Sequence, residues 1–351
     1  MSDNFDEDRK QRLNERIFAS VDRYDNRKRT KRIAYISSMA AVLIVGIFSY
    51  IIFDKGVSTS PLLQKAASST KLDNFNSEVQ LILDNQEEIK IAEKKSTLVY
   101  SSNGREVNIN NGKNISQSAA TPDKTSYNTI VVPFGKKSQL TLSDGSKVWV
   151  NSGSKLTYPT VFTSGKREVV LEGEAIFEVA HNADRPFHVL AGDNDIKVLG
   201  TVFNISGYPE DGFVETALQS GSVEITYTDR GRFFNTEQST KIVPGTVAVY
   251  NKKEQKINTK KTDIAPYFSW RNGRFIFRKN DLRHIMKKIS RHYGVDITIE
   301  DSVLAQQTFS GNLDINNDLD TVMEIMKRTS KFEFEKKDNR IHITDTYIER
   351  Q

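Results

Sequence analysis

A long uncharged run near the N-terminus constrains this chain more than any other feature. Residues 33–53 read IAYISSMAAVLIVGIFSYIIF and contain no charged side chain. A helix of about 20 residues rises about 30 Å, which is the thickness of the hydrocarbon core of a bilayer. The apolar region of a cleaved signal peptide is usually about 7 to 15 residues long and precedes a small-x-small site. This run is longer and is followed by DKGV, so the sequence predicts a single transmembrane helix over residues 33–53.

The charges that flank this run predict its orientation. The segment RKRTKR, residues 27–32, lies directly before it, and only Lys55 lies close behind it. Basic residues concentrate on the cytoplasmic side of membrane helices. We therefore expect an inner-membrane protein that crosses once, with a cytoplasmic N-terminus and a periplasmic C-terminus.

Composition excludes several classes of protein. The chain has 351 residues, enough for about two folded domains with tails. Its 50 basic and 45 acidic side chains give a formal net charge of +5 and are scattered along the chain. A nucleic-acid-binding protein concentrates its basic residues in a stripe, so direct nucleic-acid binding is not indicated. The chain has no cysteine, which excludes disulfides, thiolate metal sites and a cysteine nucleophile.

The first 32 residues are too few to build a core, yet they carry an apolar stripe at helical spacing. Leu13, Ile17 and Val21 recur every four residues, and Phe18 lies beside them. A short isolated helix is marginal in water, so the segment is expected to become ordered against a partner. The alternative is a solvated cytoplasmic extension of the membrane helix.

The exported part begins with a polar tether over residues 54–77 and continues as short strands to about residue 260. The segment QLILDNQEEIKI, residues 80–91, aligns with QLTLSDGSKVWV, residues 139–150. Each has two short apolar runs separated by a polar turn, Asp84-Asn85 in one and Asp144-Gly145 in the other, which is typical of a β-hairpin. No long helical period interrupts residues 78–260, so an all-β domain is predicted there, solenoid-like or jelly-roll-like in type.

The pattern changes after residue 270. A strand, the amphipathic segment DLRHIMKKISRHYG and a second strand are followed by another strand, the helical segment NDLDTVMEIMKRTS and a closing hairpin. Asn280 or Asp281 and Asn317 or Asp318 are plausible helix N-caps, and Gly294 is a plausible C-terminal stop. Residues 270–345 are therefore expected to form two β-α-β units in tandem. The predicted fold class is mainly β plus α+β, with a single transmembrane helix.

Catalytic constellations are absent from the sequence pattern. The five histidines, His181, His188, His284, His292 and His342, show no metal-binding spacing. Glu174 and Glu178 alternate with apolar residues and read as a solvated strand face, although a carboxylate pair can also perform acid-base chemistry. Trp149 lies in a strand and either packs or lines a groove. We expect no enzyme activity on an external substrate, no metal and no cofactor.

One glycine interrupts an apolar run. The segment VLGTVFNI, residues 198–205, reads as a strand except at Gly200-Thr201. Glycine is depleted in strand interiors because it has no side chain to pack and loses more backbone entropy on folding. Gly200 therefore indicates a bulge, a close approach of backbone or an unusually accessible peptide bond.

Several blocks of the exported part resemble one known family. They are VVPFGKKSQLTLSDGSKVWVNSGSKLTYP, REVVLEGEAIFEVAHNADRPFHVLAG, IKVLGTVFNI and ALQSGSVEI, in this order between Val131 and about Ile225. Together they resemble the FecR family of transmembrane anti-sigma factors. The two β-α-β segments resemble the C-terminal domain that accompanies this family, which is similar to the short N-terminal domains of secretins and TonB-dependent receptors.

The resemblance implies a signalling circuit. In the family, the periplasmic signalling domain of an outer-membrane TonB-dependent transducer contacts the FecR-like protein, whose cytoplasmic segment holds or releases an extracytoplasmic-function sigma factor. The stripe Leu13, Ile17, Phe18 and Val21 would then be the contact to the sigma factor. A longer helical region often precedes the membrane helix in this family, whereas only about 32 residues stand here. Some relatives cleave themselves at a Gly-Thr bond in the matching block, which implies self-cleavage between Gly200 and Thr201.

Two other functions remain open at this stage. One is a membrane-anchored periplasmic adaptor without a sigma factor, which the short N-terminal segment favours. The other is an exported glycan-binding module or enzyme.

Overall fold

The computed structural model describes residues 41–47, 61–68, 78–117, 125–230, 235–330 and 332–346. The chain divides into two compact units, residues 1–59 and 60–351. In the first unit, residues 41–47 are helical and exposed. Within the described ranges, no helix is both long and apolar enough to cross a bilayer. Most of the predicted span 33–53 lies outside these ranges, as do Leu13, Ile17, Phe18 and Val21.

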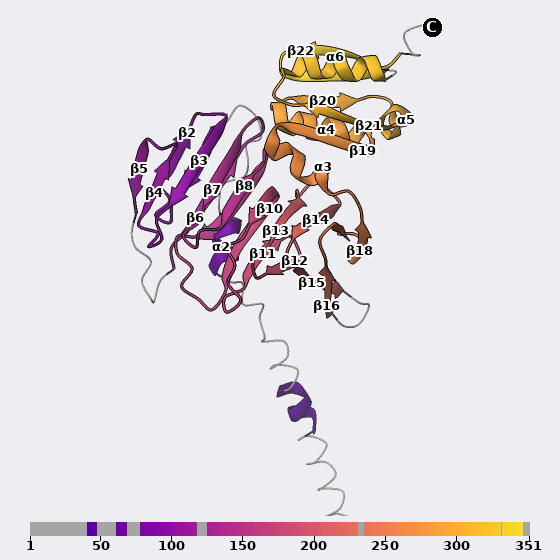
Figure 1. Cartoon of the computed structure of the whole chain (residues 1–351). Helices are drawn as coiled ribbons and strands as arrows, with labels where there is room; N and C mark the ends of the chain where they lie inside the picture. Colours follow the sequence, from indigo (N-terminus) through magenta and orange to yellow (C-terminus); the bar gives the residue numbers. More distant parts are fainter. Residues whose placement is uncertain are drawn as a thin grey trace, which may run out of the picture. The chain divides into compact units, whose positions relative to one another are not determined.

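The second unit is built mainly from strands, as predicted (Figure 1). In chain order the first eighteen are β1 Val79–Ile82, β2 Glu88–Ile91, β3 Lys95–Tyr100, β4 Glu106–Ile109, β5 Lys113–Ser116, β6 Tyr127–Val132, β7 Lys137–Thr141, β8 Lys147–Val150, β9 Ser154–Pro159, β10 Arg167–Glu178, β11 Phe187–Ala191, β12 Asn194–Val198, β13 Val202–Gly207, β14 Phe213–Ser220, β15 Val223–Arg230, β16 Asn235–Ile242, β17 Thr246–Asn251 and β18 Lys256–Lys261. We call these strands the β body.

The strands of the β body pair in two series. One runs β2-β1-β6-β9-β10-β11-β12-β15-β16, and the other runs β5-β4-β3-β7-β8-β10-β13-β14-β17-β18. Both predicted hairpins form, β1–β2 in the first series and β7–β8 in the second. Buried side chains of both series make one hydrophobic core, in which Leu81, Leu98, Leu140 and Val189 are fully buried.

Strand β10 belongs to both series, and a glycine lies where it changes partners. Residues 170–172 pair with β9, whereas residues 175–178 pair with β8. Gly173, between them, has φ +107°, a conformation that L side chains rarely adopt. A Cβ at this position would lie 2.3 Å from Ser154 Oγ, so only glycine allows the two strands to approach here.

Part of the predicted tether is folded onto the β body. Helix α2, Pro61–Ser68, contacts β6, β9 and β10. Leu62 and Ala66 are four residues apart, hence on one helical face, and both are buried against Val170. Lys155 Nζ donates a hydrogen bond of 3.0 Å to the carbonyl of Ala66. The polar composition of residues 54–77 concealed this short apolar stripe.

A short connection covers the outer face of the second series of strands. It consists of α3, Ala265–Phe268, and the 3-10 helix η1, Ser269–Asn272. Phe268 and Trp270 belong to a second hydrophobic cluster that includes Ile176, Ala217 and Val247 of the β body. The connection is therefore part of the packed structure.

The C-terminal module begins at residue 274. Its elements are β19 Arg274–Asp281, α4 Leu282–Tyr293, β20 Asp296–Ile299, α5 Ser302–Gln306, β21 Thr308–Asp314, α6 Leu319–Thr329, β22 Phe332–Lys337 and β23 Arg340–Asp345. The predicted order of strands and main helices is confirmed, but the tandem arrangement is wrong. Strand β19 pairs with β21, whereas β20 pairs with β23, which also pairs with β22. The two β-α-β segments are thus interleaved, because both strands of the first segment, β19 and β20, pair with strands of the second.

Local signals at the helix ends are confirmed. The Asp281 side chain caps α4 by accepting a hydrogen bond from His284 N, at 2.7 Å, and Asp318 caps α6 by accepting one from Thr321 N, at 2.8 Å. Gly294 ends α4 in the left-handed region, with φ 72°.

Candidate functional site

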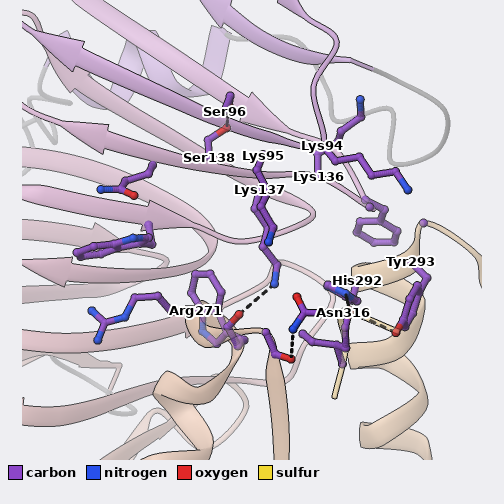
Figure 2. Close-up of a pocket in the computed structure, with 18 of the residues that line it drawn as sticks. Lys94, Lys95, Ser96, Lys136, Lys137, Ser138, Arg271, His292, Tyr293 and Asn316 are labelled. Carbon is purple, nitrogen blue, oxygen red and sulfur yellow. Dashed lines mark hydrogen bonds between the residues drawn. The ribbon is translucent and has the colours of Figure 1, made fainter. Parts of the chain in front are cut away.

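A cavity of about 980 Å³ lies where the β body meets the C-terminal module. Its lining from the β body includes two lysine pairs, Lys94-Lys95 and Lys136-Lys137. Figure 2 shows these lysines on one side of the site, and His292, Tyr293 and Asn316 on the other. The two tryptophans of the chain, Trp149 and Trp270, and Arg271 also line the cavity.

Strand register brings the lysine pairs together. Strands β3 and β7 run parallel, with Lys95 opposite Lys137 and Ser96 opposite Ser138. The buried hydroxyls of the two serines share a hydrogen bond of 2.5 Å. Below them, Leu98 and Leu140 are opposite each other and fully buried in the core. The core-facing residues therefore fix the register that places the lysines side by side.

The connection and the C-terminal module form the opposite wall. Lys137 Nζ donates a hydrogen bond of 3.1 Å to the carbonyl of Trp270 (Figure 2). Gly135 N donates one of 2.8 Å to the carbonyl of Arg291. Arg271 stacks on Trp149, with its guanidinium carbon 4.8 Å from the ring centroid. The wall is thus held to the β body by backbone and cationic contacts.

The lining of the cavity is strongly basic. Burial, with a smaller contribution from the nearby charge of Lys95, lowers the pKa of Lys137 to about 8 against the opposing effect of Glu174. Burial, reinforced by Lys137, also lowers the pKa of His292 to about 4, so its imidazole is neutral near pH 7. Nε2 of His292 bonds the Ile315 carbonyl at 3.0 Å, and a neutral ring must therefore carry its proton on Nε2.

A second set of contacts ties α4 to the loop between β13 and β14. Arg291 NH2 lies 2.6 Å from a Glu210 carboxylate oxygen and 3.0 Å from one of Asp211, and Lys287 Nζ lies 2.9 Å from Asp211. The Arg291 guanidinium carbon also lies 3.6 Å from the Tyr208 ring centroid. Burial alone would raise the pKa of Asp211, but Arg291 and Lys287 together lower it below its usual value. These contacts fix one end of α4 against the β body.

Glu174 does not lie on a solvated strand face as the sequence suggests. It is 4% exposed, and its carboxylate accepts hydrogen bonds from Asn151, at 2.8 Å, and Asn204, at 3.1 Å. The Asn204 amide also donates to the carbonyl of Tyr267, at 2.7 Å. The alternation of polar and apolar residues in β10 does not reveal this burial, because the connection of α3 and η1 covers the polar face of the strand. Glu178 is exposed, in agreement with the sequence-based interpretation.

Gly200 is required by a close approach of backbone. A Cβ there would lie 2.7 Å from His181 Cα and 2.6 Å from His181 Nδ1. The β13–β14 pairing also shifts register between Val202 and Phe203. Thr201 is 3% exposed, and its hydroxyl donates a hydrogen bond of 3.0 Å to the Ser222 carbonyl. The Gly200-Thr201 bond therefore lies in a packed turn, and its cleavage stays a prediction.

The histidines do not gather into a metal site. Across the described ranges, no group of three or more His, Cys, Asp or Glu side chains could hold a metal ion. His188 instead bonds Asp195 at 2.8 Å, and His342 lies 3.3 Å from Glu300.

Sequence reasoning missed the lysine pairs, although a signal was present. Lys94-Lys95-Ser96 and Lys136-Lys137-Ser138 repeat the tripeptide KKS, each before an alternating strand. The predicted repeat paired residues 80–91 with residues 139–150, whereas the structure sets residues 95–99 beside residues 137–141. Trp149, the candidate groove residue, does line the cavity.

Comparisons with known proteins agree with this architecture. Residues 128–224 match the family model described as FecR protein, and residues 274–343 match the model described as FecR, C-terminal. None of the curated proteins matches the chain in sequence.

Two of the solved structures that are similar to this chain are described as "a putative anti-sigma factor from Parabacteroides distasonis ATCC 8503". One, at 28% identity and a TM-score of 0.56, is matched over 62% of this chain and 99% of its own. The other, at 28% identity and a TM-score of 0.55, is matched over 61% of this chain and 97% of its own. The resemblance to the FecR family is therefore confirmed: the chain carries a FecR domain followed by a FecR C-terminal domain.

Proposed function

We propose that this chain regulates a sigma factor across the inner membrane. A signal from an outer-membrane TonB-dependent transducer reaches the β body and C-terminal module in the periplasm, and the cytoplasmic N-terminal segment holds or releases an extracytoplasmic-function sigma factor. The observation that carries this proposal is the pair of FecR domains, together with the 28% identity to a structure described as that of an anti-sigma factor.

The mechanism that we propose is protein recognition without a cofactor. Residues 33–53 supply the membrane helix, and the stripe Leu13, Ile17, Phe18 and Val21 supplies the contact to the sigma factor. Apolar residues at i, i+4 and i+8 fill a hydrophobic groove, and such anchors dominate the affinity of a helix for a groove. Catalysis is restricted to self-cleavage at Gly200-Thr201.

Replacing Leu13 and Ile17 with Asp tests the contact. The double variant is expected to lose co-purification of the sigma factor, by tenfold or more, because two charges would enter an apolar groove. Gln11→Asp with Asn14→Asp is the matched control, since it adds the same two negative charges outside the stripe, and it should retain most of the binding.

Normal binding by the Leu13→Asp, Ile17→Asp variant would remove the stripe from the interface. A wild-type chain that captures no sigma factor at all would favour the adaptor function. Turnover or binding of a glycan by the chain without a transducer would favour an exported enzyme or glycan-binding module.

A further inference from the structure

Four lysines that line the cavity lie close enough together for their positive charges to repel one another. Lys95 is directly opposite Lys137 in the parallel β3–β7 pair, and Lys94 and Lys136 precede them in the chain. Like charges directly opposite each other destabilise a sheet. The register is fixed by the buried Ser96–Ser138 and Leu98–Leu140 pairs, so the strands cannot slide to separate the charges.

No carboxylate of the described chain forms an ion pair with this cluster. Glu174 favours the charged form of Lys137, but its carboxylate is bonded to Asn151 and Asn204. Lys136 and Lys137 donate to the carbonyls of Ala92 and Trp270, and none of the four lysines forms an ion pair within that part of the chain. The cavity lining holds four lysines and Arg271 but only two carboxylates, those of Glu78 and Asp318. Asp318 is already engaged as the cap of α6.

The cavity has the size and wall chemistry of a ligand site. Its volume of about 980 Å³ is at the upper end of the range for small-molecule pockets, roughly 300–1,000 Å³. Trp149, Phe134 and Tyr293 supply apolar surface, and Arg271 supplies a further cation. Nε1 of Trp270, a hydrogen-bond donor on the same wall, is buried without a hydrogen-bond partner in the described structure.

We propose that this cavity binds a small multivalent anion, one that carries two or more carboxylate or phosphate groups. The lysine pairs contact the anion from the β body and Arg271 contacts it from the connection, since all of them line the cavity. Because the bound anion bridges the β body and the connection to the C-terminal module, its binding stabilises the junction between them. This ligand site goes beyond the proposed function and does not depend on a sigma factor.

Tryptophan fluorescence gives a local readout, because the only two tryptophans of the chain both line the cavity. Citrate and pyrophosphate are titrated into the full-length chain in mild detergent, at constant ionic strength. We expect a saturable change in fluorescence with one or both anions and none with acetate at the same concentration.

Two double variants, each of which removes two lysine charges, compare the cavity with an exposed strand. Lys94→Gln with Lys95→Gln should weaken binding at least tenfold. Lys260→Gln with Lys261→Gln, two adjacent exposed lysines of β18, should stay within twofold of wild type. Lys95→Gln alone should raise the unfolding temperature in the absence of anion, because it removes the repulsion from Lys137, and should reduce the gain that the anion gives.

Three results would overturn the proposal. The first is the absence of a saturable response to citrate or pyrophosphate in the wild-type chain. The second is equal weakening by the β3 and β18 lysine variants, which would indicate general surface charge. The third is a response to hexaglutamate but to neither small anion, which would make the cavity a docking surface for an acidic peptide.

Discussion

Single residues decide where the backbone of this protein can approach itself. Gly173 allows β10 to pass beside Ser154, and Gly200 allows the turn before β13 to lie against His181. Gly221, with φ +89°, lies against the same turn, where a Cβ would be 2.6 Å from Thr201 Oγ1 and 2.8 Å from the Gly200 carbonyl oxygen. The Gly200-Thr201 peptide is therefore packed between two segments and cannot relax freely.

At this scale we predict that Thr201 is the nucleophile of a self-cleavage. Its hydroxyl would attack the Gly200 carbonyl carbon, the amide nitrogen would leave as the Thr201 amine, and water would hydrolyse the resulting ester. Thr201→Ser should still yield two fragments that meet between residues 200 and 201, whereas Thr201→Ala should remain one chain. Mass spectrometry of membrane preparations measures this. An intact peptide across residues 200 and 201 in the wild type would make Gly200 purely structural.

Among the elements, α4 connects the C-terminal module to the β body. Its capping and apolar face are local properties, but Arg291 reaches Glu210, Asp211 and the Tyr208 ring on the β body. The side chains of Arg291 and Asp211 are 10% and 12% exposed, so this ion pair is largely shielded from water. Removing one member of such a pair leaves a charge poorly compensated.

We therefore expect Arg291→Ala to lower the free energy of unfolding by about 2–4 kcal/mol. Hydrogen exchange should increase in α4 and in the β13–β14 loop, measured by mass spectrometry. Lys336→Ala is the control, because Lys336 pairs with Asp320 at an exposed site, and should change stability by less than about 1 kcal/mol. Equal effects of the two substitutions would show that the Arg291 contacts do not hold the junction.

For the molecule as a whole, two partly buried histidines predict the response to pH. Burial, with contributions from nearby cations, lowers the pKa of His284 and His292 to about 4, below the ordinary value of 6.5. Between pH 6.5 and pH 4 the unfolded chain therefore binds protons that the folded chain does not, so stability rises with pH across this window.

Lowering the pH from 7 to 4.5 should reduce the free energy of unfolding by about 2 kcal/mol for each histidine, after allowing for partial solvent exposure. Denaturant unfolding at the two pH values measures this. The double variant His284→Gln, His292→Gln should lose that part of the pH dependence. An unchanged pH dependence in the double variant would assign acid sensitivity to carboxylates such as Asp211 instead.

The whole chain is also needed for the proposed relay. Shortening it after Gly273 removes the C-terminal module but keeps Phe268 and Trp270, which cover the apolar outer face of the β body. We expect this variant to remain at normal abundance in membranes while sigma-dependent transcription no longer responds to the transducer's ligand. Unchanged induction in a reporter assay would remove the module from the signalling path.

The sequence by itself determined the local features of this protein. Turn residues and alternation predicted the β1–β2 and β7–β8 hairpins, and capping residues predicted the ends of α4 and α6. These features depend on interactions between near neighbours, which the order of residues specifies directly.

Only the tertiary structure decided which distant segments meet. Interleaving of β19 with β21, burial of Glu174 and the alignment of Lys95 with Lys137 all depend on partners that are distant in the sequence. A strand presents the same alternation whichever neighbour it pairs with, and a polar side chain reads as exposed until another element covers it. The sequence therefore contained both lysine pairs, but packing of the shared core brought them together into one basic cavity.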